Sequence, residues 1–323
     1  MLCKIILVNW KGASDTCNCI ANLERTVGVE WFAVVCENGS PDDSITELQN
    51  FLAERYTKRV RSNTELQVFD YYAEESAIPR VTLVVSPFNM GFAGGSNLAC
   101  HHAHANVKAD FVWFLNNDTE VEPETLSRMI DRIRQDPSIG ICGCTLVYAH
   151  DRKTVQAFGG AVYCPWFGST REIGNGKTWP CTVNVSTIEA RMRYVSGASA
   201  LVTSEFIDRV GLMREDYFLY YEEIDWAERA RKAGFRLGYA SQAVVFHKVG
   251  AVLGTGKSVH RSMLSEYYGI LGKQVITRRF FPWALPTVYL FSMLQILRRC
   301  MQGYWRRAYM MAKILLGFRP PSP

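Results

Sequence analysis

A buried strand that ends in a cluster of polar side chains constrains the fold of this chain more than any other feature. Five apolar residues, 111–115, are followed at once by Asn116, Asn117 and Asp118. An apolar run bounded by turn-forming residues is typical of a strand buried on both faces, as in a parallel sheet covered by helices. Ligands of such sheets bind beyond the carboxyl ends of the strands. Asp118 is therefore the first functional candidate, although an Asx turn that begins a helix within residues 119–125 would explain the same pattern.

The chain before this strand alternates between strand patterns and amphipathic helix patterns. Strands are predicted over residues 4–8, 31–36 and 80–86, and helices over residues 15–27 and 44–55. Strand, helix and strand at this spacing predict right-handed βαβ units. We therefore expect an α/β fold with a mostly parallel, Rossmann-like sheet flanked by helices.

Length and composition are those of a globular protein. With 323 residues, 48% of them apolar, the chain can form one large α/β domain and an appendage. The amino-terminal residues lack the basic stretch and long apolar core of a signal peptide. Ten cysteines occur, and no two have the two-residue gap of zinc knuckles or redox dithiols. We expect free thiols and a reducing cytoplasm.

A glycine-rich stretch, residues 89–97, precedes a predicted helix of small residues. Glycines at a helix start let backbone N–H groups approach a phosphate. The spacing is not that of a dinucleotide-binding loop, Gly-x-Gly-x-x-Gly. On the same helix, His101, His102 and His104 could suggest a metal site, but we interpret them as solvent-facing side chains.

A second acidic cluster, Glu222, Glu223 and Asp225, opens a predicted helix that follows several aromatic residues. Acidic residues stabilise a helix N-terminus, which is the simplest explanation for them. A carboxylate buried among aromatic side chains would also have a raised pKa, as a general base requires. His247 ends a further predicted strand, and its importance depends on its proximity to Asp118.

The segment between these clusters, residues 150–190, is rich in Gly, Pro and Trp and shows no clear period. Long irregular segments inside compact domains usually carry function or are mobile. We interpret this one as an insertion or a lip that faces the substrate.

Taken in order, the motifs resemble those of the family-2 inverting glycosyltransferases, particularly the rhamnosyltransferase-like branch that builds bacterial surface polysaccharides. The resemblance covers residues 5 to about 250 and rests on six motifs in family order. These are VNWKG at 8–12, VCENGS at 35–40, NMGFAGGSN at 89–97, LNND at 115–118, GASALV at 197–202, and FLYYEEIDW at 218–226 with the RKAGF and VFH that follow.

The resemblance implies one GT-A domain that binds a nucleotide-diphosphate sugar and uses a divalent metal, Mg²⁺ or Mn²⁺, to hold the donor diphosphate. It implies that Glu37 contacts the nucleoside, that Asp118 and His247 bind the metal, and that Glu223 is the base that deprotonates an acceptor hydroxyl. The other donor-binding residues it implies are Asn9, Asn38, Gly91, Phe92, Gly94, Asn97, Asn116 and Asn117. Candidates on the acceptor side are Glu222, Asp225 and Trp226, and either of these two acids could be the base instead.

Three departures from the family pattern bear on these assignments. Asn116 replaces the first acid of an Asp-x-Asp element, which would weaken metal binding, and Glu223 replaces the usual Asp. The pair Tyr267 and Tyr268 is not followed by the Arg-Asn that the family often has, so a diphosphate contact from that segment is in doubt.

Because of these departures, the alternative is a non-catalytic nucleotide-sugar-binding or membrane-scaffold protein. A nucleotidyltransferase would need a basic glycine-rich loop after the first strand, and none is present.

The carboxyl-terminal region differs from the rest of the chain in charge. We expect the catalytic domain to span residues 1–260 and a basic, helical region to span residues 261–323. Since the whole chain carries +5 and the nine Lys and Arg residues after Glu266 carry +9, the first 266 residues carry −4. Basic amphipathic helices with Trp and Tyr are typical of anionic membrane interfaces. The alternative is a pair of helices packed on the domain, and a Pro-interrupted stretch between Arg279 and Arg298 is too short to span a membrane.

Partners and location follow from these features and from the resemblance. The resemblance implies dTDP-rhamnose as the donor and a bacterial polysaccharide or lipid-linked glycan as the acceptor. We expect a cytoplasmic protein, peripheral on the inner face of the cytoplasmic membrane. Nucleic acid is not expected as a partner, because the basic residues interleave with aliphatic ones and form no open groove.

Overall fold

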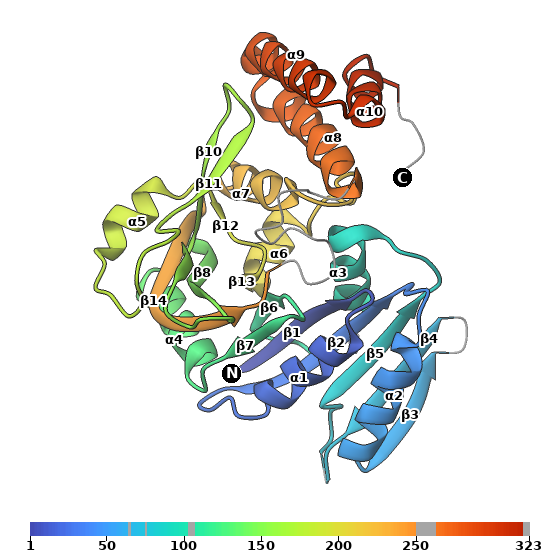
Figure 1. Ribbon diagram of the computed structural model, residues 1–323. Helices are drawn as coiled ribbons and strands as arrows, with labels where there is room; N and C mark the ends of the chain where they lie inside the picture. Colours follow the sequence, from blue (N-terminus) through green and yellow to red (C-terminus); the bar gives the residue numbers. More distant parts are fainter. Residues whose placement is uncertain (64–65, 75, 103–106, 250–262, 319–323) are drawn as a thin grey trace.

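A mixed sheet of eleven strands forms the centre of the molecule (Figure 1). The computed structural model describes residues 1–63, 66–74, 76–102, 107–249 and 263–318. In the middle of the sheet β1 pairs in parallel with β2 and β6, and β2 pairs in parallel with β5. The bounds are Leu2–Asn9 for β1, Glu30–Asn38 for β2, Val81–Ser86 for β5 and Phe111–Leu115 for β6. The α/β class and the parallel units are confirmed.

Antiparallel strands complete the other half of the sheet. β13 (Ser199–Thr203) lies between β6 and β8 (Ile139–Tyr148) and runs antiparallel to both. β14 (Arg236–His247) is parallel to β8, and β7 (Thr119–Val121) pairs antiparallel with β14. This last pairing joins the segment after β6 to the end of β14.

Several strands have no clear signal in the sequence. β3 (Lys58–Asn63) and β4 (Gln67–Tyr72) extend the edge beyond β5, and β9 (Val155–Phe158) pairs with β8. Residues 150–190, expected to be an irregular lip, contain a two-stranded hairpin. Together with a short strand that follows this segment, the hairpin forms a separate three-stranded sheet. Its strands are β10 (Gly160–Cys164), β11 (Ser169–Glu172) and β12 (Tyr194–Val195).

Helices cover both faces of the main sheet because its strands are apolar on both sides. Alternate residues of β2 enter different cores: Phe32 and Val34 face one, and Ala33 and Val35 face the other. The second core also contains residues of α1 (Ala13–Leu23), α2 (Ser44–Arg55) and α4 (Thr125–Gln135), whereas the first contains residues of α3 (Gly91–His102), α5 (Val185–Arg191), α6 (Ser204–Val210) and α7 (Glu222–Lys232). The helix predicted over residues 44–55 is confirmed with the same bounds.

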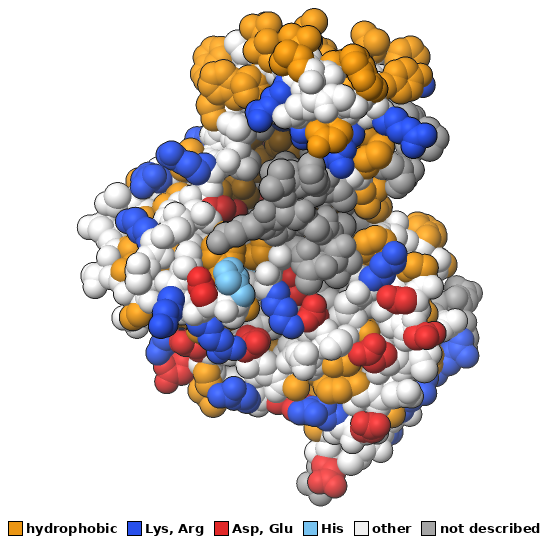
Figure 2. All heavy atoms as spheres, viewed as in Figure 1, with side chains coloured by type: hydrophobic (Ala, Val, Ile, Leu, Met, Phe, Trp, Pro, Cys, Tyr) orange, Lys and Arg blue, Asp and Glu red, His pale blue; other side chains and the backbone are white. Residues whose placement is uncertain are grey.

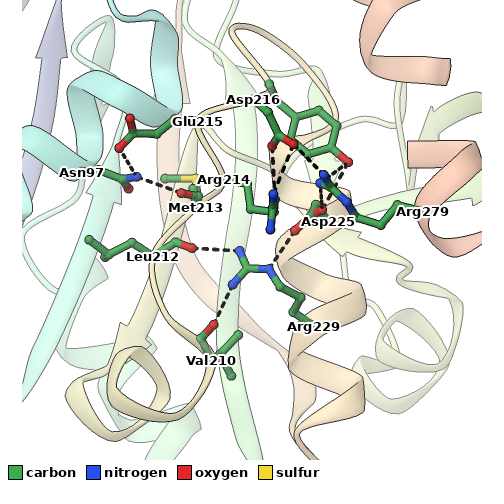
Figure 3. Close-up of polar contacts among 11 residues, drawn as sticks. Asn97, Val210, Leu212, Met213, Arg214, Glu215, Asp216, Asp225, Arg229 and Arg279 are labelled. Atoms are coloured by element: carbon green, nitrogen blue, oxygen red, sulfur yellow. Dashed lines mark hydrogen bonds and ion pairs between the residues drawn. The ribbon is translucent and has the colours of Figure 1, made fainter. Parts of the chain in front are cut away.

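Three carboxyl-terminal helices lie above α7 and beside the tip of the β10–β11 hairpin (Figure 1). They are α8 (Met263–Phe280), α9 (Leu285–Met301) and α10 (Trp305–Leu315), with a 3₁₀ turn, η1 (Pro282–Ala284), between the first two. Ile276 and Val288 belong to the same apolar core as α7. Arg279 forms ion pairs with Asp216 and Asp225, which join α8 to the domain (Figure 3). Across the described ranges, no helix combines the length and hydrophobicity needed to cross a membrane.

Candidate active site

A large open cleft of about 1040 Å³ lies where the strand ends, the start of α7, the β10–β11 hairpin and the carboxyl-terminal helices meet. It is lined by side chains from segments that are far apart in the sequence. Of the residues proposed from the sequence, those that line it are Asn38, Gly91, Phe92, Asn116, Asn117, Asp118, Glu222, Glu223 and His247. The cleft therefore combines the two acidic clusters with the strand-end histidine.

Asp118 and His247 face each other in this cleft. Asp118 Oδ1 lies 3.1 Å from His247 Nε2, and both side chains are largely buried. The antiparallel register, with His247 opposite Thr119, brings them together. Burial alone would raise the pKa of Asp118, but its hydrogen bond to His247 and the nearby positive charges outweigh burial and lower it. Asp118 is therefore a carboxylate at neutral pH.

The other nitrogen of His247 contacts Gln156. His247 Nδ1 lies 2.9 Å from Gln156 Oε1, and Asn116 Nδ2 lies 3.3 Å from His247 Nε2. If Nδ1 donates to Gln156, the lone pair of Nε2 points toward a carboxylate oxygen. In this tautomer the hydrogen bond from Nε2 to Asp118 is absent, and a cation held by Nε2 and the Asp118 carboxylate would take its place. The donor types therefore fit a divalent metal. Among the described residues, however, no group of three or more His, Cys, Asp or Glu side chains is placed to hold a metal.

Asn38 organises the glycine-rich turn at the start of α3. Its side chain accepts a hydrogen bond from the Met90 N–H and donates one to the Gly91 carbonyl. Gly91 has a φ of +75°, and a Cβ there would clash with the Phe218 carbonyl oxygen, which would be only 2.2 Å away. Glycine is therefore required at this position by its contact with the segment before α7, besides any approach of a phosphate.

Four residues proposed for the donor site do not line the cleft. Asn9 accepts a hydrogen bond from the Thr16 hydroxyl at 2.8 Å. Asn97 donates to the Met213 carbonyl at 2.8 Å and to Glu215 at 2.9 Å (Figure 3). Glu37 is fully buried and accepts from the Ser40 N–H at 2.8 Å, and burial raises its pKa. Gly94 packs against Met90. In this structure all four support the loops around the cleft.

Of the two acids of the second cluster that line the cleft, Glu223 is the one whose pKa is raised less. Burial raises its pKa, while its own backbone N–H and that of Gly197 oppose the shift by hydrogen bonding to the carboxylate. Glu222 beside it is 2% exposed, and its Oε2 has no hydrogen-bond partner among the residues that the structure describes. Burial and the charge of Glu223 raise the pKa of Glu222 well above its usual range. Glu222 is therefore the neutral member of the pair.

Asp225 and Trp226, the other acceptor-side candidates, point away from the cleft. Asp225 is fully buried and pairs with Arg229 at 2.7 Å and with Arg279 at 2.8 Å (Figure 3). Trp226 is 2% exposed, packs between aromatic rings of the core and donates to the Gly211 carbonyl. The structure gives Asp225 an ion-pairing role and Trp226 a packing role, because the start of α7 turns them inward.

The backbone before α7 sets this orientation. Tyr220 and Tyr221 have φ values of +70° and +73°, a left-handed conformation that is uncommon for side chains of this size. The Tyr221 hydroxyl donates to the Gly168 carbonyl, and the Tyr220 hydroxyl contacts that of Ser265. Consecutive left-handed residues are characteristic of functional sites where the surroundings hold a strained chain.

Two acidic residues that line the cleft, Glu172 and Glu266, were not among the residues proposed from the sequence, and Glu266 is held in ion pairs by Arg299 and Arg307. Glu172, at the end of β11, lines the cleft together with Tyr194 and Glu223. Burial raises its pKa to about 7, and the charge of Glu223 adds to the effect. The sequence STRE around it is polar and gives no signal beyond strand propensity. The histidines of α3 lie elsewhere: His101 and His102 do not line the cleft, and His104 lies outside the described residues.

Residues 61–196, less than half of the chain, match the family model Glycosyl transferase family 2. A low-salt glycan biosynthesis hexosyltransferase of Haloferax volcanii is 23% identical over 246 residues, which cover 76% of this chain and 66% of the relative. An N-acetylglucosaminyl-diphospho-decaprenol L-rhamnosyltransferase of Mycobacterium tuberculosis is 24% identical over 153 residues, which cover 43% of this chain and 47% of the relative. The chain thus spans about half to two thirds of the length of these curated relatives.

Solved structures share the fold at low sequence identity. GalNAc-T7 with UDP, GalNAc and Mn²⁺ superposes with a TM-score of 0.64 at 10% identity, over 92% of this chain and 51% of that chain. The mannosyltransferase PcManGT of Pyrobaculum calidifontis, in complex with GDP-Man and Mn²⁺, has a TM-score of 0.54 at 14% identity, over 96% and 78%. TarS 1–349 of S. aureus, in complex with UDP-GlcNAc, has 0.53 at 13%, over 90% and 71%. The GT-A fold that these structures share with the chain and the family match over residues 61–196 together support a family-2 glycosyltransferase.

Proposed function

We propose that this protein is an inverting glycosyltransferase that moves a sugar from a nucleotide diphosphate to a hydroxyl of a glycan or lipid-linked acceptor. The observation that carries the proposal is the single cleft lined by Asp118, His247 and Glu223. Strand-end groups suited to a metal thus share a cleft with a carboxylate suited to proton transfer. The family match and the shared fold agree with this chemistry.

Asp118 and His247 are the residues that would hold a divalent metal, with Asn116 beside them. A bound Mg²⁺ or Mn²⁺ would supply positive charge to the departing diphosphate. Among the described residues, Asp118 and His247 are the two charged or imidazole ligands proposed here, so substrate phosphates and water would complete the ligand shell, as is common for Mg²⁺. Gln156 holds the His247 ring with one nitrogen directed at Asp118.

Glu223 is the proposed general base. It would take the proton of the acceptor hydroxyl as that oxygen forms a bond to the anomeric carbon and the bond to the diphosphate breaks. Attack from the face opposite the leaving group inverts the anomeric configuration. The raised pKa of Glu223 brings its basicity closer to that of a group poised to act near neutral pH.

The choice of donor and acceptor to test rests on the relatives alone. We propose rhamnose from dTDP-rhamnose as the first donor to test, because one relative is a rhamnosyltransferase. The same relative acts on an N-acetylglucosaminyl-diphospho-decaprenol, so a diphospho-polyprenol glycan is the first acceptor to test.

We further propose that the carboxyl-terminal helices dock on an anionic membrane surface. Leu290, Met293, Leu294 and Leu297 follow the i, i+3, i+4, i+7 spacing on α9, and each is more than half exposed. Figure 2 shows hydrophobic side chains gathered over α9 and α10. Exposed Arg298 adjoins this face and also lines the cleft, so acidic lipid headgroups fit its charge. An acceptor with a lipid anchor would then reach the cleft from the bilayer.

The activity is tested with the purified chain and a set of nucleotide sugars. Thermal shift with and without Mn²⁺ should identify a stabilising donor, and that donor should then be turned over with farnesyl-diphosphate-linked N-acetylglucosamine as acceptor. Binding of a nucleotide sugar without turnover would favour the non-catalytic alternative.

The membrane proposal is tested by sedimentation with vesicles of phosphatidylglycerol and phosphatidylcholine. The wild type should sediment with anionic vesicles, and the double variant Leu294→Gln with Leu297→Gln should lose most of this binding. Val27→Gln, at a comparably exposed apolar side chain on the loop after α1, is the matched control. Equal sedimentation of all three proteins would contradict the proposal.

A further inference from the structure

The β10–β11 hairpin carries a carboxyl group into the cleft. In the three-stranded sheet Glu172 lies opposite Ala161 of β10, and Tyr194 of β12 lies opposite the same alanine from the other side. Directly opposed residues of antiparallel strands point to the same face of a sheet. Glu172 and Tyr194 therefore flank Ala161 on one face, and both line the cleft with Glu223.

One oxygen of Glu172 lacks a partner. Its Oε2 is buried and has no hydrogen bond to any of the residues that the structure describes. An unsatisfied buried polar atom is unfavourable. A hydroxyl group of a bound substrate would supply the missing partner.

Glu172 and Glu223 have different surroundings, and these favour a proton on Glu172 and a charge on Glu223. Backbone N–H groups stabilise the charge on Glu223, whereas no such hydrogen bond supports a charge on Glu172. Burial raises the pKa of Glu172 to about 7, so this group is half protonated near pH 7 and mostly protonated below it. Acids whose environments separate their pKa values are suited to different tasks in one reaction.

We propose that Glu172 binds the acceptor sugar: its protonated carboxyl group donates a hydrogen bond to an acceptor oxygen and so holds the neighbouring, attacking hydroxyl against Glu223. This inference rests on the proposed glycosyltransferase function and names the acceptor class as a sugar with adjacent hydroxyl or ether oxygens. Glu223 takes the proton of the attacking hydroxyl. Glu172 keeps its own proton throughout, so it supplies orientation alone.

If Glu172 donates a hydrogen bond to the acceptor, the variants Glu172→Gln and Glu172→Ala should differ in their acceptor KM. A purely structural role predicts no such difference. Glu172→Gln retains a hydrogen-bond donor of nearly the same shape, so we expect transfer within about threefold of the wild type. Glu172→Ala removes the donor, so the acceptor KM should rise about tenfold or more. The donor KM should change less than the acceptor KM in both variants, because the residues proposed to hold the donor lie elsewhere in the cleft.

The test measures transfer to farnesyl-diphosphate-linked N-acetylglucosamine, with the KM of the acceptor and that of the donor determined separately. Arg171→Ala, the exposed neighbour of Glu172 on β11, is the matched control and should behave as the wild type. In the wild type the acceptor KM should rise as the pH passes about 7 and Glu172 loses its proton, and Glu172→Gln should remove this rise. The Gln variant keeps the side-chain volume, so the test stands even where the Ala variant folds poorly.

Two results would overturn the inference. An unchanged acceptor KM in a folded Glu172→Ala variant would show that Glu172 does not touch the acceptor. A Glu172→Gln variant without transfer would show that Glu172 itself is the base. In either case the wild type still transfers sugar, which distinguishes this failure from a failure of the proposed function, where the wild type transfers none.

Discussion

Glu223 lies directly against Gly197. A Cβ at position 197 would be 2.5 Å from Glu223 Oε1, and the Gly197 N–H hydrogen bonds to the same carboxylate. The turn before β13 therefore holds the side chain in place from one side, and the left-handed residues before α7 hold its backbone from the other. A carboxylate fixed from two directions is positioned for one reaction geometry.

Gly197→Ala should displace this carboxylate. We expect kcat to fall about tenfold to a hundredfold while donor binding is retained, since misplacing a catalytic group by about 1 Å has effects of this size. Gly269→Ala is the control, because Gly269 also lines the cleft but has no atom near the position of its added Cβ. Equal kcat values for the two variants would argue against a positioned Glu223.

Glu222→Gln should stabilise the protein at neutral pH. The folded-state pKa of Glu222 is raised, so its contribution to stability is present below the usual value of 4.5 and is lost as pH rises through the folded pKa. The Gln variant has no charge to bury, and we expect it to gain about 1 kcal/mol in the free energy of unfolding at pH 7. Denaturation at pH 4 and pH 7 checks this: the gain should be larger at pH 7. A gain that is larger at pH 4 would contradict the assignment.

Asp225→Asn should affect stability and not chemistry. The substitution leaves Arg229 and Arg279 with a buried neutral partner, and breaking a buried pair of this kind costs about 3–5 kcal/mol at its largest. Below its melting temperature the variant should turn over at nearly the wild-type rate, as judged from initial rates per folded molecule. A folded Asp225→Asn protein without activity would return Asp225 to the list of base candidates.

Gln156→Leu should weaken metal binding. Without its Oε1 the His247 ring loses the partner that orients it, and loss of such an outer contact lowers metal affinity about tenfold or more. Gln156→Glu keeps an acceptor oxygen at that place and should retain or improve the affinity. Titration of Mn²⁺ in the presence of a nucleoside diphosphate checks both, and equal affinities of the Leu variant and the wild type would contradict the predicted site.

A site residue could be predicted from the sequence where its own segment carries a signal, and not where its position depends on contacts with distant segments. Asp118 and His247 follow apolar strands and are recognisable from their own segments. Their 3.1 Å separation depends on the antiparallel pairing of β7 with β14, which joins residues more than a hundred positions apart. Resemblance to a family placed them together, whereas strand patterns alone could not.

The acids of α7 show a second limit. Glu222, Glu223 and Asp225 are nearly equivalent in the sequence, and only the direction in which the helix begins separates them. That direction is set by left-handed conformations at Tyr220 and Tyr221, which residue propensities do not predict. Glu172 was missed for a similar reason, because it lies on the short polar strand β11, which reaches the cleft only through the pairing of β10 with both β11 and β12.

The most direct test of the account is a transfer assay with Mn²⁺ on the wild type, Asp118→Ala and Glu223→Gln. We predict that Asp118→Ala loses both metal-dependent donor binding and transfer, and that Glu223→Gln binds the donor as the wild type does but loses transfer by about a hundredfold or more. Transfer by Glu223→Gln at the wild-type rate would contradict the central claim that this cleft is the active site and Glu223 its base.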